Sequence, residues 1–252
     1  MSSVLTLRLA GPLQAWGVSA RFTRRTTENA PTKSGVVGLL AAAQGLARDA
    51  DLSQLAALRF AVRIDQPGTR VRDFQTAHHL DTDESMPLSE RFYLADAVFV
   101  AAVEGDAALI GDLFGAVKAP AYLPYLGRRS CPPSGPVELG VHHDTTLNQV
   151  LADEPWRAAE WYQHKHPDQA TVRLSVLAEP AAGTPAGAQG VDSWRDQPVS
   201  FDPRHRRHAL RTVVTSTVTV TNPHARAPQP SAPARTRQTV PPHDPTGPLE
   251  GV

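Results

Sequence analysis

A basic segment that contains aromatic residues precedes the first predicted helix and offers the clearest candidate chemistry in the sequence. Its cations are Arg21, Arg24, Arg25 and Lys33, and its rings are Trp16 and Phe22. Cationic groups contact phosphates and rings stack on unpaired bases, so this combination is typical of single-stranded RNA binding. A helix that begins at Lys33-Ser34-Gly35 would add backbone N–H donors for a phosphate. The alternative is a solvent-exposed basic loop with Trp16 buried in the core.

The same segment can be tested as a nucleotide-binding P-loop. That motif needs glycine directly before the lysine and again five residues earlier. Thr32 and Thr27 occupy those two positions relative to Lys33. The spacing therefore excludes an ATPase of this type here.

A second candidate motif runs from Tyr125 to Pro133 and contains Gly127-Arg128-Arg129. A glycine beside two arginines allows backbone and guanidinium groups to approach a phosphate closely. The alternative is an ordinary surface turn. Cys131 is the only cysteine of the chain, which excludes an internal disulfide framework and a cysteine-rich zinc site. We expect a small buried thiol at this position.

The ten histidines include close pairs, His78-His79, His142-His143 and His205 with His208. Adjacent histidines in a strand point to opposite faces, and the sequence contains no His-Glu-x-x-His or Cys/His spacing, so no metal site is predicted. No cofactor of another kind is expected. A metal-independent ribonuclease would need a general base, a general acid and a cation. His78, His79, Tyr93 and Lys33 could supply these groups, which keeps a nuclease open as an alternative.

A late basic run completes the candidates. It comprises Arg204, His205, Arg206, Arg207, His208 and Arg211. We interpret it as a solvated face or loop in preference to a second RNA site. Contact with a partner's RNA or protein surface is the other possibility.

Hydrophobic periodicity indicates the elements that must position these residues. Alternation predicts strands over 4–9 and 60–64, and a richness in aromatic and aliphatic residues predicts a more buried strand over 91–103. Helical spacing predicts helices over 33–48 and 106–118. A polar excursion lies between residues 66 and 90, and a further strand is expected near 136–141. This β-α-β-excursion-β-α-β order is typical of an α+β, ferredoxin-like fold.

The rest of the chain divides into two parts. A helix is expected near 145–152, with strands near 171–177 and 210–220. From Ala225 onward proline is frequent and large apolar residues are scarce, which is typical of disorder. The predicted organisation is a ferredoxin-like RNA-binding domain over 1–144, a small, mostly β C-terminal region over 145–224, and a disordered tail over 225–252.

Composition limits the class of protein. The 25 Lys and Arg residues balance 25 Asp and Glu residues, so the net charge is zero. This balance argues against a histone-like, purely electrostatic nucleic-acid binder but permits a local basic groove. The N-terminal residues do not follow the pattern of a secretory signal, and no apolar run is long enough for a membrane span. A cytoplasmic location without membrane association is therefore expected.

Four ordered motifs within residues 5–140 resemble the CasD-type subunits of type I-E CRISPR Cascade complexes. They are Leu7–Gly17 (LRLAGPLQAWG), Pro31–Leu40 (PTKSGVVGLL), the pair Arg72–Thr76 (RDFQT) and Arg91–Ala97 (RFYLADA), and Tyr122–Pro132 with its LGRRSCP core. The resemblance implies a ferredoxin-like RAMP fold with a thumb-like β-hairpin at about 68–91.

The same resemblance implies a function. The chain would be a non-catalytic subunit that binds and caps the 5′ handle of the CRISPR RNA. It would contact the neighbouring backbone and large subunits, and target DNA through the complex. The alternative, taken from a related subtype, is a metal-independent endoribonuclease that processes repeat RNA. The expected RNA-binding residues are Gln14, Trp16, Arg21, Arg24, Arg25, Lys33, Ser34, Arg128 and Arg129.

Overall fold

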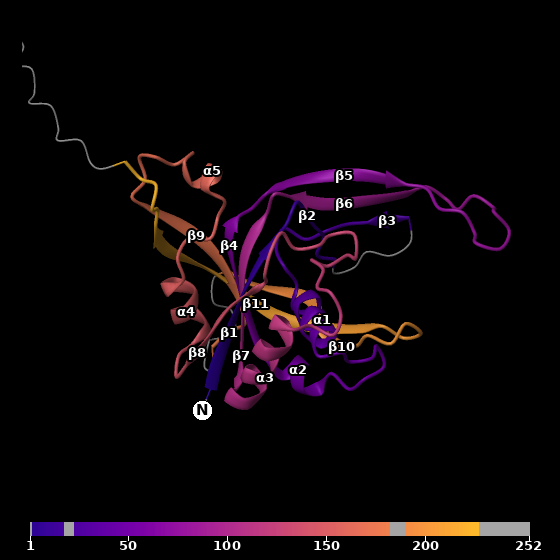
Figure 1. The fold of residues 1–252 in the computed structure, drawn as a ribbon, viewed down its shortest axis with the longest axis horizontal. Coiled ribbons are helices and arrows are strands. Elements are labelled where there is room, and N and C mark those ends of the chain that lie inside the picture. The colour runs from indigo at the N-terminus through magenta and orange to yellow at the C-terminus, as the bar shows by residue number, and fades with distance from the viewer. Residues whose placement is uncertain (1, 18–22, 182–189, 227–252) are drawn as a thin grey trace, which may run out of the picture.

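The structure, a computed structural model, describes residues 2–17, 23–181 and 190–226. Its main feature is a seven-stranded sheet in the order β10-β11-β9-β4-β7-β1-β8 (Figure 1). The strands are β1 (Ser2–Ala10), β4 (Arg59–Gln66), β7 (Val98–Asp106), β8 (Glu138–His143), β9 (Thr171–Ala178), β10 (Val191–Ser200) and β11 (Arg207–Thr221). The helices are α1 (Lys33–Ala43), α2 (Ser53–Ala57), α3 (Ala107–Lys118), α4 (Leu147–Asp153) and α5 (Glu160–Gln163).

A ferredoxin-like unit forms the centre of this sheet. Its chain order is β1-α1-β4-β7-α3-β8, and its spatial order is β4-β7-β1-β8. Every pairing among these strands is antiparallel. The predicted ferredoxin-like fold is thereby confirmed.

Both faces of the sheet are covered at β1. Leu5, Leu7 and Leu9 of β1 belong to the core cluster that α1 and α3 close. Val4 belongs to a second cluster beneath α4. Sequence alternation predicts Thr6 on a polar face, but its side chain is fully buried. The reason is that α4 packs against the face that the pattern assigns to solvent.

A β-hairpin projects from the sheet between β4 and β7 (Figure 1). It consists of β5 (Thr69–Gln75) and β6 (Ser89–Ala95), and β6 also pairs with β2 (Leu13–Gln14) and β3 (Arg24–Arg25). The single strand predicted over 91–103 is wrong, because the chain changes sheets within it. Asp96 takes a positive φ of 56° at the break between β6 and β7.

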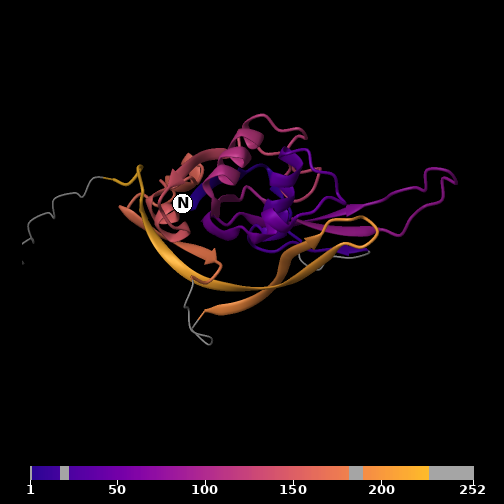
Figure 2. The same cartoon turned by 90° about the horizontal axis from the view of Figure 1, so that it is seen from below.

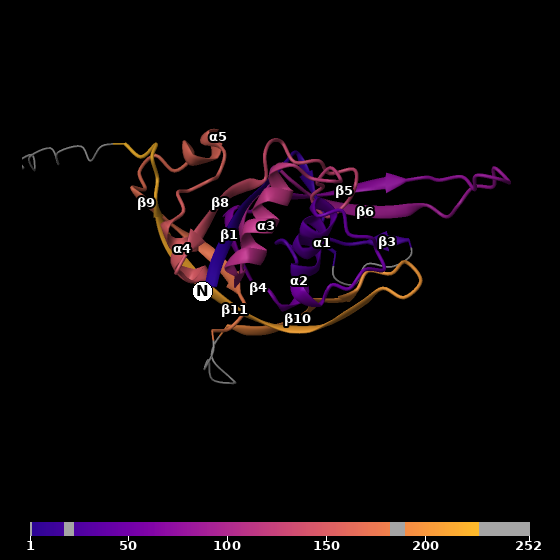
Figure 3. The same cartoon turned by 60° about the horizontal axis from the view of Figure 1, so that its bottom comes forward.

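The C-terminal strands extend the same sheet, since β9 pairs with β4 and β11 pairs with β9. The β10–β11 hairpin, hereafter the arm, curves beneath the core (Figure 2; Figure 3). The strand β10 was not expected from the sequence. It lies at the sheet edge, where polar residues and Pro198 are tolerated, so it lacks a strand-like pattern.

No helix among the described residues is both long and apolar enough to cross a membrane. The predicted disordered tail falls almost entirely on residues 227–252, which lie outside the described residues.

Candidate RNA-binding cavity

A cavity of about 880 Å³ lies between the loop at Trp16, the start of α1, the turn at Gly127 and the arm. Arginines dominate its charge: it is lined by Arg25, Arg128, Arg195, Arg206 and Arg207. Among the described residues that line it, none is acidic. A recess with one sign of charge concentrates a polyanion such as RNA, even in a chain of zero net charge.

Three of these arginines carry charge that no described carboxylate neutralises. Arg25, Arg195 and Arg207 form no ion pair with the acidic residues of the described ranges, and all three side chains are exposed. The guanidinium of Arg206 lies 5.4 Å from the ring centroid of Phe201. Guanidinium groups that have no carboxylate partner can exchange water for phosphate oxygens without breaking an internal ion pair.

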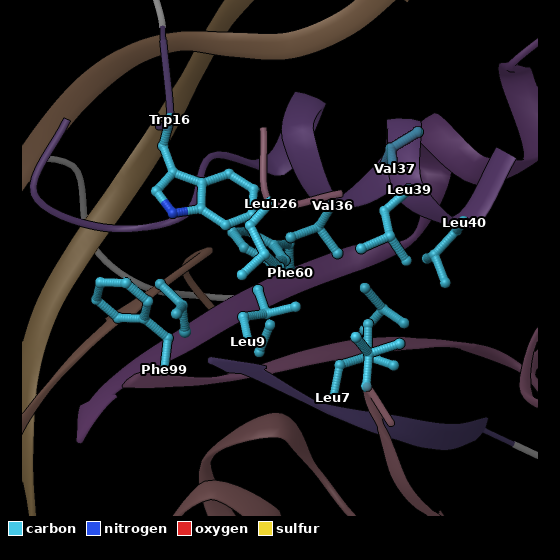
Figure 4. Close-up of a cluster of buried hydrophobic side chains, with 14 of the residues drawn as sticks. Leu7, Leu9, Trp16, Val36, Val37, Leu39, Leu40, Phe60, Phe99 and Leu126 are labelled. Atoms are coloured by element: carbon cyan, nitrogen blue, oxygen red, sulfur yellow. The ribbon is translucent and has the colours of Figure 1, made fainter. Parts of the chain in front are cut away.

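Trp16 and Gln14 are part of the core. Trp16 is 1% exposed, and its ring lies among Leu9, Val36 and Leu126 (Figure 4). Its indole Nε1 donates to Gln14 Oε1 at 3.0 Å. The buried Gln14 amide donates in turn to the carbonyls of Leu9 and Ala97. The core alternative is confirmed for Trp16, and both side chains position the loop that forms the cavity wall.

The start of α1 is already capped from within the chain. The Lys33 N–H donates to Asp196 Oδ2 at 2.8 Å, and the Gly35 N–H donates to Thr32 Oγ1 at 3.2 Å. The Lys33 ammonium lies 2.8 Å from Glu179 Oε1 and is 4% exposed. Burial lowers the pKa of Lys33, and the hydrogen bond to Glu179 opposes that effect. The phosphate site expected at this helix start is therefore occupied by a carboxylate of the arm.

Ser34, next to Lys33, lines the cavity. Its hydroxyl lies 3.4 Å from that of Thr32, the N-cap residue of α1.

Arg128 joins the two motifs that the sequence presents separately. Its guanidinium donates to the carbonyls of Arg25 and Phe92, at 2.8 and 3.1 Å. It also lies 4.7 Å from the ring centroid of Tyr93. Arg128 thus fastens β3, which carries Arg25, to β6, and it lines the cavity at the same time. Arg129, the next residue, is exposed.

Arg24 lies on β3 with its guanidinium 5.4 Å from the ring centroid of Phe92 and 3.9 Å from Glu90. It is exposed but is not among the residues that line the cavity. Arg21 and Phe22 lie outside the described residues. Of the predicted residues, Arg25, Ser34 and Arg128 line the cavity, whereas Arg24 does not. The side chains of Gln14, Trp16 and Lys33 are buried.

Gly127 is required for a close approach between two loops. It has a φ of +82°, and a Cβ at this position would lie 1.8 Å from the Ala15 carbonyl oxygen. A non-glycine residue would be strained by its dihedral angle and would clash with the backbone. The close contact that this glycine permits is with Ala15, which fixes the Trp16 loop against the LGRRSCP turn.

We expect Gly127→Ala to lower the free energy of unfolding by more than ~2 kcal/mol, because both strain and clash oppose the native loop. Gly115→Ala is a matched control, since nothing lies within 4 Å of a Cβ there and the residue is inside α3. Alanine at that site should stabilise by about 0.5–1 kcal/mol. Urea denaturation of both variants measures the difference, and equal effects would contradict the assignment.

The residues suggested for a nuclease are spread over separate elements. Tyr93 is 3% exposed and pairs with Val71 across the β5–β6 hairpin. His78 and His79 lie at the hairpin tip, where His78 bridges Ser85. His78 lies seven positions after Val71, which corresponds to about 23 Å if the chain is extended. Lys33 is buried against Glu179 and is not among the residues that line the cavity.

Cys131 is fully buried in the main core, as expected from the sequence. Burial raises the pKa of its thiol, so the neutral form dominates at physiological pH. Its place in the fold is that of a small core side chain.

Sequence reasoning missed the contribution of the arm. Arg206 and Arg207 belong to the late basic run that the sequence suggests is a solvated face, and Arg195 does not stand out in the sequence. The run extends into the first residues of β11, which pairs with β10. Arg206 and Arg207 therefore line the same cavity as Arg25 and Arg128. The clustering of cations at 204–211 was the available signal, but its position in space depends on the unexpected strand β10.

The ferredoxin-like sheet, the projecting hairpin and the arginine-lined cavity are consistent with the RAMP-type protein that the sequence resemblance predicts. Comparison with known proteins identifies the family. The model of the CRISPR-associated protein (Cas_Cas5) family matches residues 4–214. The chain therefore belongs to the Cas5 family of CRISPR-associated proteins.

Individual relatives agree with this assignment. The chain is 41% identical to the CRISPR system Cascade subunit CasD of Escherichia coli strain K12, over 73% of this chain and 92% of the relative. It superposes on a chain of a solved CRISPR RNA-guided surveillance complex with a TM-score of 0.70 and 31% identity, over 89% of this chain and 94% of the other. A crystal structure of a Cas protein gives a TM-score of 0.63 and 32% identity, over 90% and 100% of the two chains.

Proposed function

We propose that this chain is the subunit of a Cascade-type, CRISPR RNA-guided surveillance complex that binds the 5′ handle of the CRISPR RNA. The observation that carries the proposal is the cavity lined by five arginines and no described acidic residue. Its similarity to the Cascade subunit CasD and to a chain of a surveillance complex supports the same assignment. RNA would enter as a single strand, whose phosphates and bases are both accessible.

The cavity suits a short single strand in size and chemistry. Its volume of about 880 Å³ lies near the upper end of the range for ligand pockets, and both the core loops and the arm line it. Arg25 approaches from the β3 side, whereas Arg195 and Arg207 approach from the arm. Phosphates held from two sides would fix the path of the strand, and Ser34 and Thr32 offer hydroxyls toward it.

The β5–β6 hairpin supports assembly with a neighbouring subunit. Its tip and flanks expose apolar side chains, including Phe74, Met86 and Leu88 at about half of their surface and Leu80 at 97%. Apolar residues gathered on a projecting element indicate a protein interaction surface. In the proposed complex this surface meets the backbone subunit.

The role proposed for the chain is structural rather than catalytic. A metal-independent ribonuclease would require its acid, base and cation to surround one scissile phosphate. His78, Tyr93 and Lys33 lie on the hairpin tip, beneath Arg128 and against Glu179, respectively. This placement favours RNA binding over RNA cleavage.

Co-purification tests the proposal. Tagged full-length protein, isolated from cells that express its CRISPR locus, should carry partner subunits and a CRISPR RNA of uniform 5′ end. Purified protein incubated with repeat RNA in EDTA should leave the RNA intact. A stable monomer free of RNA and partners would contradict the proposal. Site-specific cleavage that is lost in His78→Ala or Tyr93→Phe would establish the endoribonuclease alternative.

A further inference from the structure

The arm is fastened to the core by a group of four charged residues, of which three are buried and one is partly buried. Asp196 of β10 is fully buried and accepts two hydrogen bonds from the Arg211 guanidinium, at 2.9 and 2.7 Å. It also accepts the N–H of Lys33 at the start of α1. The Lys33 ammonium binds Glu179, whose Oε1 lies 3.7 Å from Arg211 Nε. The group contains two cations and two anions, so its formal charge is balanced.

This group connects elements that lie far apart in the sequence. Glu179 follows β9 and its backbone N–H donates to the Phe60 carbonyl of β4, while its Oε2 accepts the Phe60 N–H at 3.3 Å. Gln197, the residue after Asp196, donates to the Ala56 carbonyl of α2 at 2.8 Å. The arm is therefore joined to both α1 and α2 near the middle of β10.

The fastening point coincides with an irregularity in the β10–β11 ladder. The register shifts between Trp194 and Gln197, so Arg195 and Asp196 form a β-bulge. A bulge changes the direction in which neighbouring side chains point. Here it turns Asp196 into the protein interior, while Arg195 lines the cavity. A second shift, between Pro198 and Ser200, lies at Val199, which also lines the cavity.

We propose that Asp196 is a positioning residue for RNA binding: by holding the bulge against Arg211 and the start of α1, it directs Arg195 and the adjacent arm arginines into the cavity. The inference rests on the proposed binding of RNA in that cavity. Asp196 itself is buried and would not contact the RNA. Its effect would reach the RNA through the placement of Arg195 and Arg207.

The variant Asp196→Asn removes the charge with little change of shape. We expect it to weaken binding of the full-length protein to its co-purified CRISPR RNA by about tenfold, equivalent to ~1.4 kcal/mol. The plot of log affinity against log salt should also become flatter, by about 0.7 for each phosphate that the variant no longer binds. Asp192→Asn is the matched control, because Asp192 lies on the same strand, is exposed and bonds only to its neighbours Ser193 and Trp194 among the described side-chain hydrogen bonds.

A double-mutant cycle distinguishes positioning from general destabilisation. If Asp196 acts through Arg195, then Arg195→Ala should cost little further affinity in the Asp196→Asn background. Hydrogen exchange over residues 191–211, measured without RNA, should be faster in Asp196→Asn than in Asp192→Asn. Additive losses in the cycle, or an unchanged salt dependence, would overturn the inference.

Failure of the proposed function would give a different pattern. Wild-type protein that does not bind CRISPR RNA would refute RNA binding itself, whereas wild-type binding with unaltered Asp196→Asn binding would refute only the positioning role. If Asp196→Asn does not fold, Arg211→Lys replaces it in the same measurements. Lysine keeps the charge but loses the bidentate contact with Asp196. We therefore expect a smaller loss of RNA affinity than in Asp196→Asn, together with a flatter salt dependence than in the wild type. Wild-type affinity and salt dependence in Arg211→Lys would overturn the inference.

Discussion

Replacing Arg63 with alanine should lower the free energy of unfolding by about 3–5 kcal/mol, the largest loss of stability that we expect from a single change. The Arg63 side chain is fully buried on β4 and binds both carboxylate oxygens of Asp65, at 2.7 and 2.8 Å. It also donates to three carbonyls that end α4 and begin the next segment, those of Leu151, Glu154 and Pro155. Its removal would leave a carboxylate and three carbonyls buried without this donor.

Arg59→Ala is the matched control for Arg63, since Arg59 lies on the same strand and pairs with Glu104 at 2.7 Å. Its side chain is 37% exposed, so water screens the ion pair and we expect a loss of only ~0.2–1 kcal/mol. Urea denaturation followed by circular dichroism measures both variants. Similar losses for Arg59→Ala and Arg63→Ala would contradict the role assigned to the buried network.

The double change Arg195→Ala with Arg207→Ala should greatly reduce RNA affinity and its dependence on salt. Both side chains line the cavity, and no described carboxylate pairs with either. Each phosphate that is bound on a single strand contributes about 0.7 to the slope of log affinity against log salt. A variant that binds two fewer phosphates should therefore have a slope flatter by about 1.4. Fluorescence anisotropy with the co-purified CRISPR RNA, over a series of salt concentrations, provides the measurement.

A charge-matched control for this variant is Arg48→Ala with Arg173→Ala. Both residues are exposed and neither lines the cavity. If the RNA bound nonspecifically to any cationic surface of the protein, the two double variants would lose the same amount of RNA affinity. Binding in the cavity predicts a large effect of the first pair and a small effect of the second, so equal slopes would exclude the cavity as the RNA site.

Much of the central fold is predictable because its elements have regular local patterns. The apolar spacing from Val36 to Leu46 and the alternation of Leu5, Leu7 and Leu9 depend only on neighbouring residues. The break at Asp96 is harder to predict from the sequence, because apolar residues continue from β6 into β7 although these strands belong to different sheets. β10 is hidden for the opposite reason: an edge strand beside solvent has no need of apolar alternation.

The sequence predicts a candidate site rich in arginine for binding RNA, but it identifies only some of the residues that line the cavity. Composition and motif point to arginines near 25 and 128, and the structure places both at the cavity. The partners of Lys33 could not be inferred, because Glu179 and Asp196 lie about 150 residues away in sequence and meet it only through β9 and β10. The arm arginines depend on the same long-range pairing.

The hydrogen bonds that Arg128 makes to the backbone complicate its use as a test of RNA binding. A motif-based test would remove Arg128 and Arg129 together and measure RNA binding. Because Arg128 holds the carbonyls of Arg25 and Phe92, its loss would also disturb the cavity wall. Arg195 and Arg207 separate binding from folding more cleanly, since no hydrogen bond from either guanidinium to the described residues is observed.

Binding of CRISPR RNA in the arginine-lined cavity can be tested by ultraviolet cross-linking of the assembled complex, followed by mass spectrometry of the nucleotide-bearing peptides. We predict cross-links from the 5′ handle to peptides that contain Arg25, Gly127–Arg128 and residues 195–209. Handle cross-links confined to other surfaces, such as the β8 edge or α5, would show that the RNA binds outside the cavity.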